Sequence, residues 1–182
     1  MSTHMIVRTG FAAALAGGLL LGGLAPAAQA ATATAAVTAA ATAAGSFGPY
    51  GYGGVRLGMS AKTAKATGKV VAKGGSAPSP TCTGWDLKAH PTGRDSVGLF
   101  ISKKHGVAVI FAPKGARTPQ GIGLGSTKQQ LKRAYPKLKT AASGYPYVTT
   151  PGNPKAYYSF LLDAKGTIYE MALGLPQQDC VN

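Results

Sequence analysis

The sequence predicts an α+β protein of two tandem units, each a short helix followed by about three antiparallel strands, with the helices packed on the sheet. Three observations predict it: a glycine-rich segment that occurs twice, a hairpin pattern that occurs twice downstream of it, and one cysteine in each copy. One helix cannot cover such a sheet well. We therefore expect the two units to pack together or to form one continuous sheet.

Residues 1–30 are typical of an export signal. His4 and Arg8 precede an apolar run over residues 11–25, and Ala28-Gln29-Ala30 then supplies the small residues that a signal peptidase requires. The run is shorter than the roughly 20 apolar residues that a membrane span needs. We expect a secreted protein, in which residues 31–51, rich in Ala, Thr and Gly, form a flexible tether.

The two repeat units are expected over residues 52–118 and 119–182. Each opens with the pattern G-[VI]-x-L-G-x-[ST], which occupies residues 54–60 in the first unit and residues 121–127 in the second. The spacing between the two segments is long enough for one supersecondary unit. Self-comparison of the chain therefore predicts a duplication.

Each glycine-rich segment leads into a predicted helix. Ser60 and Thr127 are suitable N-cap residues, and Thr127 with Gln130 fits a capping box. Gly68 ends the first helix and Pro136 ends the second.

A hairpin follows in each unit, where residues 100–107 align with residues 160–167 and a glycine lies in each turn. Further strands are expected over residues 83–88 and 145–149. Strand alternation puts three residues of each return strand on one face: Val107, Val109 and Phe111 in one unit, and Thr167, Tyr169 and Met171 in the other. It also puts Tyr158 and Phe160 in the core and turns Tyr157 to the other face.

The cysteines, Cys82 and Cys180, favour a disulfide, because an exported protein with an even number of cysteines usually pairs them. By the chain-entropy model, closing a loop this long contributes about 4–5 kcal/mol. Two buried free thiols are the alternative.

These tandem helix-then-sheet units, each opening on G-x-x-x-G-[MS]-[ST], resemble the tandem repeats of the β-lactamase inhibitor protein family and the single unit of SmpA/OmlA-type outer-membrane assembly lipoproteins. Gly58-Met59-Ser60 is most similar to the helix start of those families. The chain also resembles the small secreted proteins of high-GC Gram-positive bacteria. The resemblance implies their fold and no catalysis. The chain differs from the inhibitors in having one cysteine per repeat and an excess of basic residues. No inhibitory contact residue is therefore carried over from them.

The charge balance excludes several chemistries. The chain has 19 Lys and Arg against 5 Asp and Glu, a formal net charge of +14, and no carboxylate precedes Asp86. Paired-carboxylate hydrolysis and carboxylate-bound Ca²⁺ are therefore disfavoured. No H-x-x-x-H or C-x-x-C pattern, phosphate loop or dinucleotide turn occurs, so we expect no metal and no cofactor.

Nucleophilic catalysis also has little support. His90 and His105 are the histidines downstream of the export signal, Asp95 is the only acidic residue near either, and no nucleophile motif accompanies them. We expect surface imidazoles and no catalytic residue.

Basic residues gather on both predicted helices without any carboxylate between them. The candidate anion-binding residues are Lys62, Lys65 and Lys69 in the first helix region and Lys128, Lys132 and Arg133 in the second. The alternative is a solvated helix face. Outside the cell, the expected polyanion is an anionic cell-wall polymer or a membrane surface rather than nucleic acid.

Two tyrosines are candidates for contacting a protein partner. Tyr145 and Tyr147 lie in a Gly- and Pro-rich segment that would present them to a partner, although packing on the sheet is the alternative. We expect a secreted, non-catalytic binding protein, acting at an anionic cell-envelope surface or on another exported protein. An inhibitor of a secreted hydrolase and an enzyme of unrecognised type are the alternatives.

Overall fold

The computed structural model describes residues 45–74 and 79–181. The predicted signal peptide and residues 31–44 of the predicted tether lie outside the described residues. In chain order the elements are β1 (Gly51–Tyr52), β2 (Val55–Arg56), α1 (Ala61–Ala66), β3 (Val70–Lys73), β4 (Cys82–Leu87), β5 (Leu99–Ser102), β6 (Gly106–Phe111), α2 (Lys128–Ala134), β7 (Lys139–Thr140), β8 (Pro146–Thr149), β9 (Tyr157–Leu162) and β10 (Ile168–Gly174).

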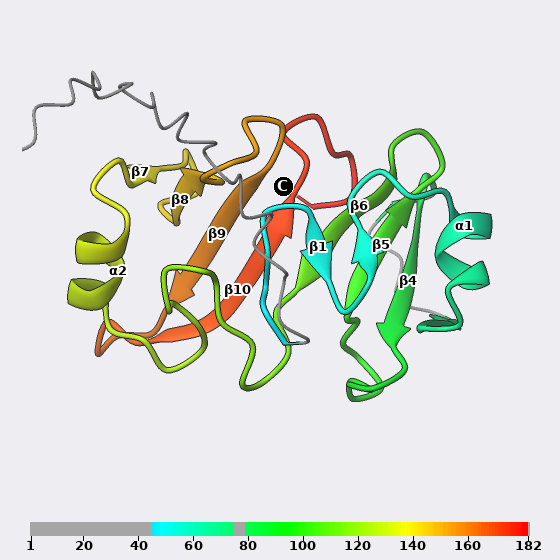
Figure 1. Ribbon diagram of the computed structural model, residues 1–182, viewed down its shortest axis with the longest axis horizontal. Coiled ribbons are helices and arrows are strands. Elements are labelled where there is room, and N and C mark those ends of the chain that lie inside the picture. Colours follow the sequence, from blue (N-terminus) through cyan, green and yellow to red (C-terminus); the bar gives the residue numbers. More distant parts are fainter. Residues whose placement is uncertain (1–44, 75–78, 182) are drawn as a thin grey trace, which may run out of the picture. The chain divides into compact units, whose positions relative to one another are not determined.

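One antiparallel sheet of eight strands dominates the fold, in the order β3-β4-β5-β6-β10-β9-β8-β7 (Figure 1). The helix α1 precedes β3–β6 and α2 precedes β7–β10. The last strands of the two sets, β6 and β10, pair at the centre of the sheet through Phe111 and Ala172. The sheet is therefore continuous, one of the two arrangements that we expected.

The expectation of about three strands after each helix was wrong, because four follow each one. The strands that the sequence did not reveal are β3 and β7, which form the two edges of the sheet. The strand β7 spans only two residues, Lys139 and Thr140, and both are exposed. So short and polar a segment carries no hydrophobic period that a sequence pattern could detect.

The last part of the predicted tether, residues 45–51, is not a tether. Phe47 is fully buried, and its ring packs against those of Tyr52 and Tyr158 at centroid distances of 6.0 and 5.9 Å. Its N–H donates to the carbonyl of Arg117 at 2.8 Å, and the Tyr158 hydroxyl donates to the Phe47 carbonyl at 2.8 Å. One buried aromatic residue thus brings this segment into the core.

Both predicted helix starts are confirmed. The Ser60 hydroxyl accepts from the Thr63 N–H at 3.1 Å, and Thr127 with Gln130 completes a capping box at 3.2 and 2.8 Å. The helix α1 ends at Ala66, so Lys69 lies beyond it. Lys69 would share a helix face with Lys62 and Lys65 only if the helix continued past Gly68, and it does not.

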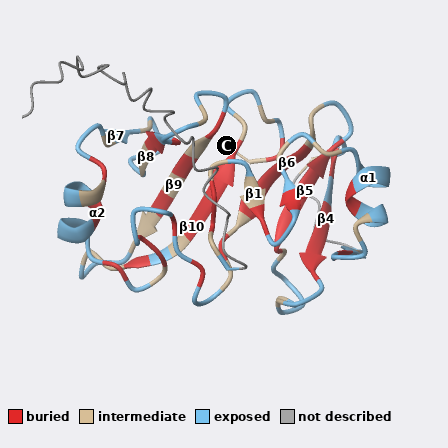
Figure 2. Cartoon of the chain, in the orientation of Figure 1, coloured by how far each residue is buried: buried red, intermediate tan, exposed pale blue. Residues whose placement is uncertain are grey.

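The two faces of the sheet carry separate apolar clusters. The larger core lies on the face that both helices cover, and Ala64 of α1 and Leu131 of α2 are fully buried in it. Figure 2 shows that buried residues predominate along the central strands, whereas much of each helix is exposed. The side chains of Tyr158 and Phe160 belong to it, as alternation predicted. The opposite face holds a smaller cluster of six buried residues: Cys82, Phe100, Ala108, Val109, Ala172 and Cys180.

A β-bulge interrupts β6. Ile101 pairs with Val107 and Phe100 pairs with Val109, which leaves Ala108 as the extra residue. The bulge changes which side chains point to each face, because one added residue reverses the alternation beyond it. Val107 accordingly lies in the larger core while Val109 lies in the smaller cluster. The prediction that Val107, Val109 and Phe111 share a face was wrong for Val107.

A second bulge occupies the corresponding place in β10. Leu162 pairs with Ile168 and Leu161 pairs with Glu170, so Tyr169 is the extra residue. Tyr169 is 54% exposed, whereas Met171 is fully buried. The prediction that Tyr169 and Met171 share a face was therefore also wrong.

The residue before each bulge binds one of the glycine-rich segments. Val107 accepts from the Gly58 N–H at 2.9 Å and donates to the Met59 carbonyl at 2.8 Å. Ile168 accepts from the Gly125 N–H at 2.8 Å and donates to the Ser126 carbonyl at 2.9 Å. The two segments with the shared sequence pattern thus make the same pair of backbone hydrogen bonds.

The predicted disulfide is confirmed, since Cys82 and Cys180 are bonded with their Cα atoms 5.6 Å apart. Such bonds are typical of proteins outside the reducing cytosol. A partly buried ion pair links β3 to β4, with Lys73 Nζ 3.3 Å from Asp86 Oδ2. Within the described residues, neither helix is long or apolar enough to cross a bilayer.

Candidate functional site

A groove of about 660 Å³ lies on the sheet face that the helices do not cover. It crosses β6, β10, β9 and β8, between the segment that follows β10 and the loop that joins β7 to β8. The lining residues are Val109, Phe111, Lys139, Ala141, Ala142, Ser143, Tyr145, Pro146, Tyr147, Thr149, Pro154, Ala156, Tyr157, Ser159, Leu161, Glu170, Ala172, Pro176 and Val181. Most of these side chains are apolar or aromatic, as is usual in binding pockets.

The aromatic walls of the groove are held in place by their neighbours. Tyr147 and Tyr157 meet edge to face with ring centroids 6.4 Å apart. A Cβ atom at Gly174 would lie 2.9 Å from the Tyr157 ring, so this glycine leaves the space that the ring occupies. Phe111 meets Phe100 of the smaller cluster edge to face at 5.8 Å. These contacts fix the rings before any partner arrives.

Glu170 is the one carboxylate among the residues that line the groove. Burial raises the pKa of Glu170 above its ordinary value, because the ionised form loses hydration there. Burial likewise raises the pKa of Tyr157, although a hydrogen bond with Gln178 opposes the shift. The groove therefore favours neutral groups, and a partner that removes more water from it would favour them further.

Both tyrosines named as candidate partner contacts line the groove. Tyr145 is 43% exposed at its rim, and Tyr147 is half-buried inside it. Sequence reasoning did not name Phe111 or Leu161 as partner contacts, although both line the groove. Strand alternation puts Phe111 on the same face as Val109 and Leu161 on the same face as Tyr157, so it was the signal that could have found them.

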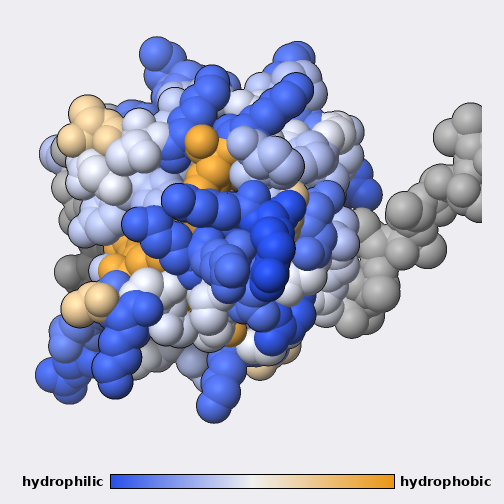
Figure 3. All heavy atoms as spheres, turned by 90° about the vertical axis from the view of Figure 1, so that its left-hand side faces the viewer, coloured by the Kyte–Doolittle hydropathy of each residue, from blue (hydrophilic) through white to orange (hydrophobic). Residues whose placement is uncertain are grey.

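The six candidate anion-binding residues do not form one surface. Lys62 and Lys65 lie on α1, and all six side chains are exposed. The helices α1 and α2 lie at opposite ends of the sheet (Figure 1), so the two basic groups are separated. The α2 region has three further exposed basic residues: Arg117, which lines a cleft together with Arg133, and Lys137 and Lys139, which follow the helix in the chain. Figure 3 views this end and shows a mainly hydrophilic surface.

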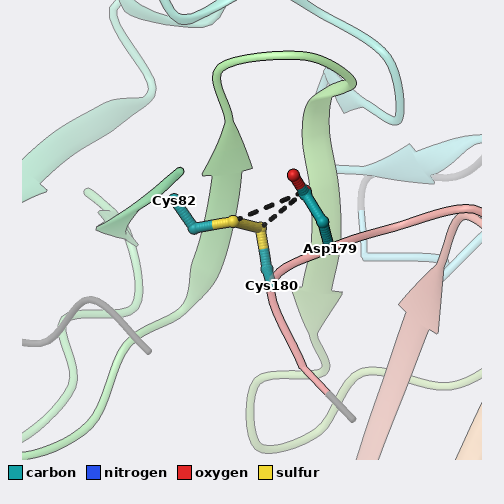
Figure 4. Close-up of side chains that lie close together, drawn as sticks. All are labelled: Cys82, Asp179 and Cys180. Carbon is teal, nitrogen blue, oxygen red and sulfur yellow. Dashed lines mark hydrogen bonds between the residues drawn. A yellow bond between two sulfur atoms is a disulfide. The ribbon is translucent and has the colours of Figure 1, made fainter. Parts of the chain in front are cut away.

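The disulfide lies beside a carboxylate (Figure 4). Asp179 Oδ1 is 3.6 Å from Cys82 Sγ and 3.8 Å from Cys180 Sγ. The two sulfur atoms are bonded to each other, so neither is the thiolate that a metal would need. The hydrogen bond with Ser102, followed by that with Thr81, lowers the pKa of Asp179. The Asp179 carboxylate is thus a polar group that lies beside the disulfide.

The two histidines lie in different surroundings. His90 Nε2 is 3.1 Å from the Tyr52 hydroxyl, and the two rings pack with centroids 5.6 Å apart. His105 lies between β5 and β6, where a turn was predicted. Asp95 is exposed in the loop between β4 and β5. Among residues 45–74 and 79–181, no hydrogen bond joins Asp95 to either histidine.

Comparison with protein-family models, with curated proteins and with solved structures finds no match for this chain.

Proposed function

We propose that the protein is an exported, non-catalytic binding protein whose groove holds an extended segment of an acidic exported protein. The observation that carries this proposal is the groove itself, an aromatic-lined apolar surface on an otherwise well-covered sheet. Export is supported by the N-terminal pattern and by the disulfide.

The protein's own C-terminal segment supports a peptide as the occupant. The Leu175 N–H donates to the Ala108 carbonyl at 3.0 Å and so extends the ladder between β10 and β6 by one residue, and a turn then leads the chain onto the same sheet face. Val181 packs against the smaller cluster, and Cys180 is bonded within it. Pro176 and Val181 also form one end of the groove. A segment of the protein's own chain, folded into turns, thus already lies on this face, and the groove continues beside it.

The charge of the protein supports an acidic partner. Its formal net charge of +14 attracts a negatively charged protein and speeds the encounter. Within the groove, Lys139 and Glu170 are the charged residues, so the lining itself carries one charge of each sign. Charge therefore raises the rate at which the two proteins meet, while burial of the apolar groove surface stabilises the complex once it has formed.

We further propose that the two helix-and-strand sets are copies of one ancestral unit. The matched bulges at Ala108 and Tyr169 support this, as do the matched hydrogen bonds of Val107 and Ile168 to the glycine-rich segments. A duplicated unit is what the resemblance to β-lactamase inhibitor proteins implies. Inhibition of a secreted hydrolase is accordingly a second candidate function, favoured by the exposed Tyr145 at the groove rim.

A matched pair of variants tests the proposal. Leu161→Arg places a cation in the groove, whereas Val71→Arg adds the same charge at an exposed position of the edge strand β3. Proteins of the culture supernatant are cross-linked to the mature protein and identified by mass spectrometry. We expect one acidic protein to be captured by wild type and Val71→Arg, with at least tenfold less captured by Leu161→Arg at unchanged Tm.

Equal capture by all three proteins would reject the groove as the binding surface. A captured hydrolase whose activity falls to zero at one equivalent of this protein would establish the second candidate. A captured acidic protein with no hydrolase activity, lost in Leu161→Arg, would support the first.

A further inference from the structure

A second, polar cleft of about 370 Å³ lies beside α2 and shares no residue with the groove. Two arginines and three hydrogen-bonding side chains contribute its polar lining: Arg117, Arg133, Gln120, Gln130 and Ser126. No carboxylate is among the residues that line it. The cleft therefore concentrates positive charge in a concave surface, where the electrostatic field is strongest.

The oxygen of Gln130 is already occupied. In the capping box, Gln130 Oε1 accepts from the Thr127 N–H at 2.8 Å. A backbone N–H can only donate, so this bond fixes which end of the amide is the oxygen. The Nε2 group, with two donors, is left to face a ligand.

Gln120 is oriented in the same way by a buried hydroxyl. The Tyr135 hydroxyl lies 2.9 Å from Gln120 Oε1 and 2.7 Å from Thr118 Oγ1. Because Thr118 Oγ1 already accepts from the Ile122 N–H, its hydroxyl proton is available to Tyr135, whose single proton is then donated to Gln120. Burial raises the pKa of Tyr135 to about 12, so the hydroxyl keeps its proton throughout the physiological range. This bond again occupies the amide oxygen and leaves the amide donors free.

The remaining polar side chains also present donors. Ser126 is buried, and its hydroxyl oxygen accepts from the Gly123 N–H at 3.1 Å, which leaves the hydroxyl proton as a donor. Arg117 Nη1 donates to the Gly121 carbonyl at 2.9 Å, which positions the guanidinium while its other N–H groups stay available. Each acceptor described here is used inside the protein, so the cleft offers donors and positive charge together.

We propose that this cleft binds a phosphate group of a phosphodiester-linked extracellular polymer. Arginine side chains bind phosphate through paired hydrogen bonds, and donors arriving from several residues suit a tetrahedral anion better than a planar carboxylate. A polymer is favoured over a single phosphate because further exposed cations lie close to the cleft residues in the chain. These are Lys128 and Lys132 on α2 and Lys137 after it.

The sharpest test changes one residue and preserves the fold. Gln130→Glu introduces a carboxylate into the cleft but retains the capping box, in which Glu serves as well as Gln. Gln129→Glu makes the same change of charge on the neighbouring residue of α2, which does not line the cleft. Binding of inorganic polyphosphate to each mature protein is measured by isothermal titration calorimetry at 50 and 200 mM salt, with thermal unfolding as the check on folding.

We expect Gln130→Glu to weaken polyphosphate binding at least tenfold relative to Gln129→Glu, with equal Tm. The double variant Arg117→Gln/Arg133→Gln should weaken it at least a hundredfold, while Lys62→Gln/Lys65→Gln, with the same net charge, should change it less than threefold. Equal losses in the two members of either pair would show general attraction to a basic protein and would reject the cleft as the phosphate-binding site.

Vesicles of phosphatidylglycerol are used in a second binding experiment. Tighter binding to vesicles than to polyphosphate, at equal phosphate concentration, would overturn the polymer as the source of the phosphate.

Discussion

The two faces of the eight-stranded sheet differ in what covers them. One face is covered by α1, α2 and the N-terminal segment around Phe47, and it holds the fully buried side chains of Tyr158, Phe160, Leu99 and Met171. Among the described residues, the other face is covered in part by the segment after β10, which a disulfide holds in place, and the groove lies beside it. Stability thus resides mainly on the helix side, which leaves the opposite side free to bind.

The largest expected effect comes from two neighbours on β9 that face opposite sides. Phe160 is fully buried in the larger core, whereas Leu161 is half-buried in the groove. We expect Phe160→Ala to lower the free energy of unfolding by about 3–5 kcal/mol and Leu161→Ala by roughly 1 kcal/mol. Urea denaturation measures both, and equal losses would contradict the assignment of stability to the helix side.

The disulfide is the next test, because it holds the only covering segment that we describe on the groove side. Replacing both Cys82 and Cys180 with Ala should lower the free energy of unfolding by about 2–5 kcal/mol, since the unfolded chain regains the freedom of a long loop. Hydrogen exchange should show that protection is lost in the segment after β10 while β9 and α2 stay protected. Uniform loss across the sheet would show that the two faces are not independent.

The smallest expected effect is that of pH on Glu170. Because burial raises the pKa of this carboxyl in the folded state, its stabilising contribution is present below the unfolded pKa of about 4.3 and is lost as pH rises through the folded pKa. Glu170→Gln should therefore be more stable than wild type at pH 7, by under roughly 1 kcal/mol, with a smaller difference at pH 3. A larger advantage at pH 3 than at pH 7 would contradict the raised pKa.

The elements with a local chemical signal could be predicted from the sequence. Ser60, Thr127 and Gln130 mark the helix starts through caps that act within four residues. Cys82 and Cys180 have no other cysteine to pair with. The inward positions of Tyr158 and Phe160 follow from alternation along an uninterrupted strand.

What could not be predicted depends on residues distant in sequence. The bulges at Ala108 and Tyr169 arise where a return strand must also bind a glycine-rich segment. Strand alternation does not indicate that a strand makes such a second contact, so it could not predict the bulges. The cleft beside α2 joins Arg133 of the helix to Arg117 of the preceding loop, a pairing that no periodic pattern contains. The lysines of the predicted helices indicated a basic surface. They did not indicate the arginines and the polar side chains of the cleft, which would select one anion over another.

The disulfide has a topological consequence as well as an energetic one. With Cys82 bonded to Cys180, the 98-residue separation between them becomes a covalent ring that contains β4–β10 and α2. A protease that cuts one peptide bond inside this ring leaves every fragment attached to the rest. A pulling force applied to the N-terminus is transmitted through the ring only at Cys82, so it unravels the chain up to that residue and then stops. Outside a cell, where nicking and shear are common, a single internal cut therefore leaves the groove and the cleft on one covalently continuous molecule.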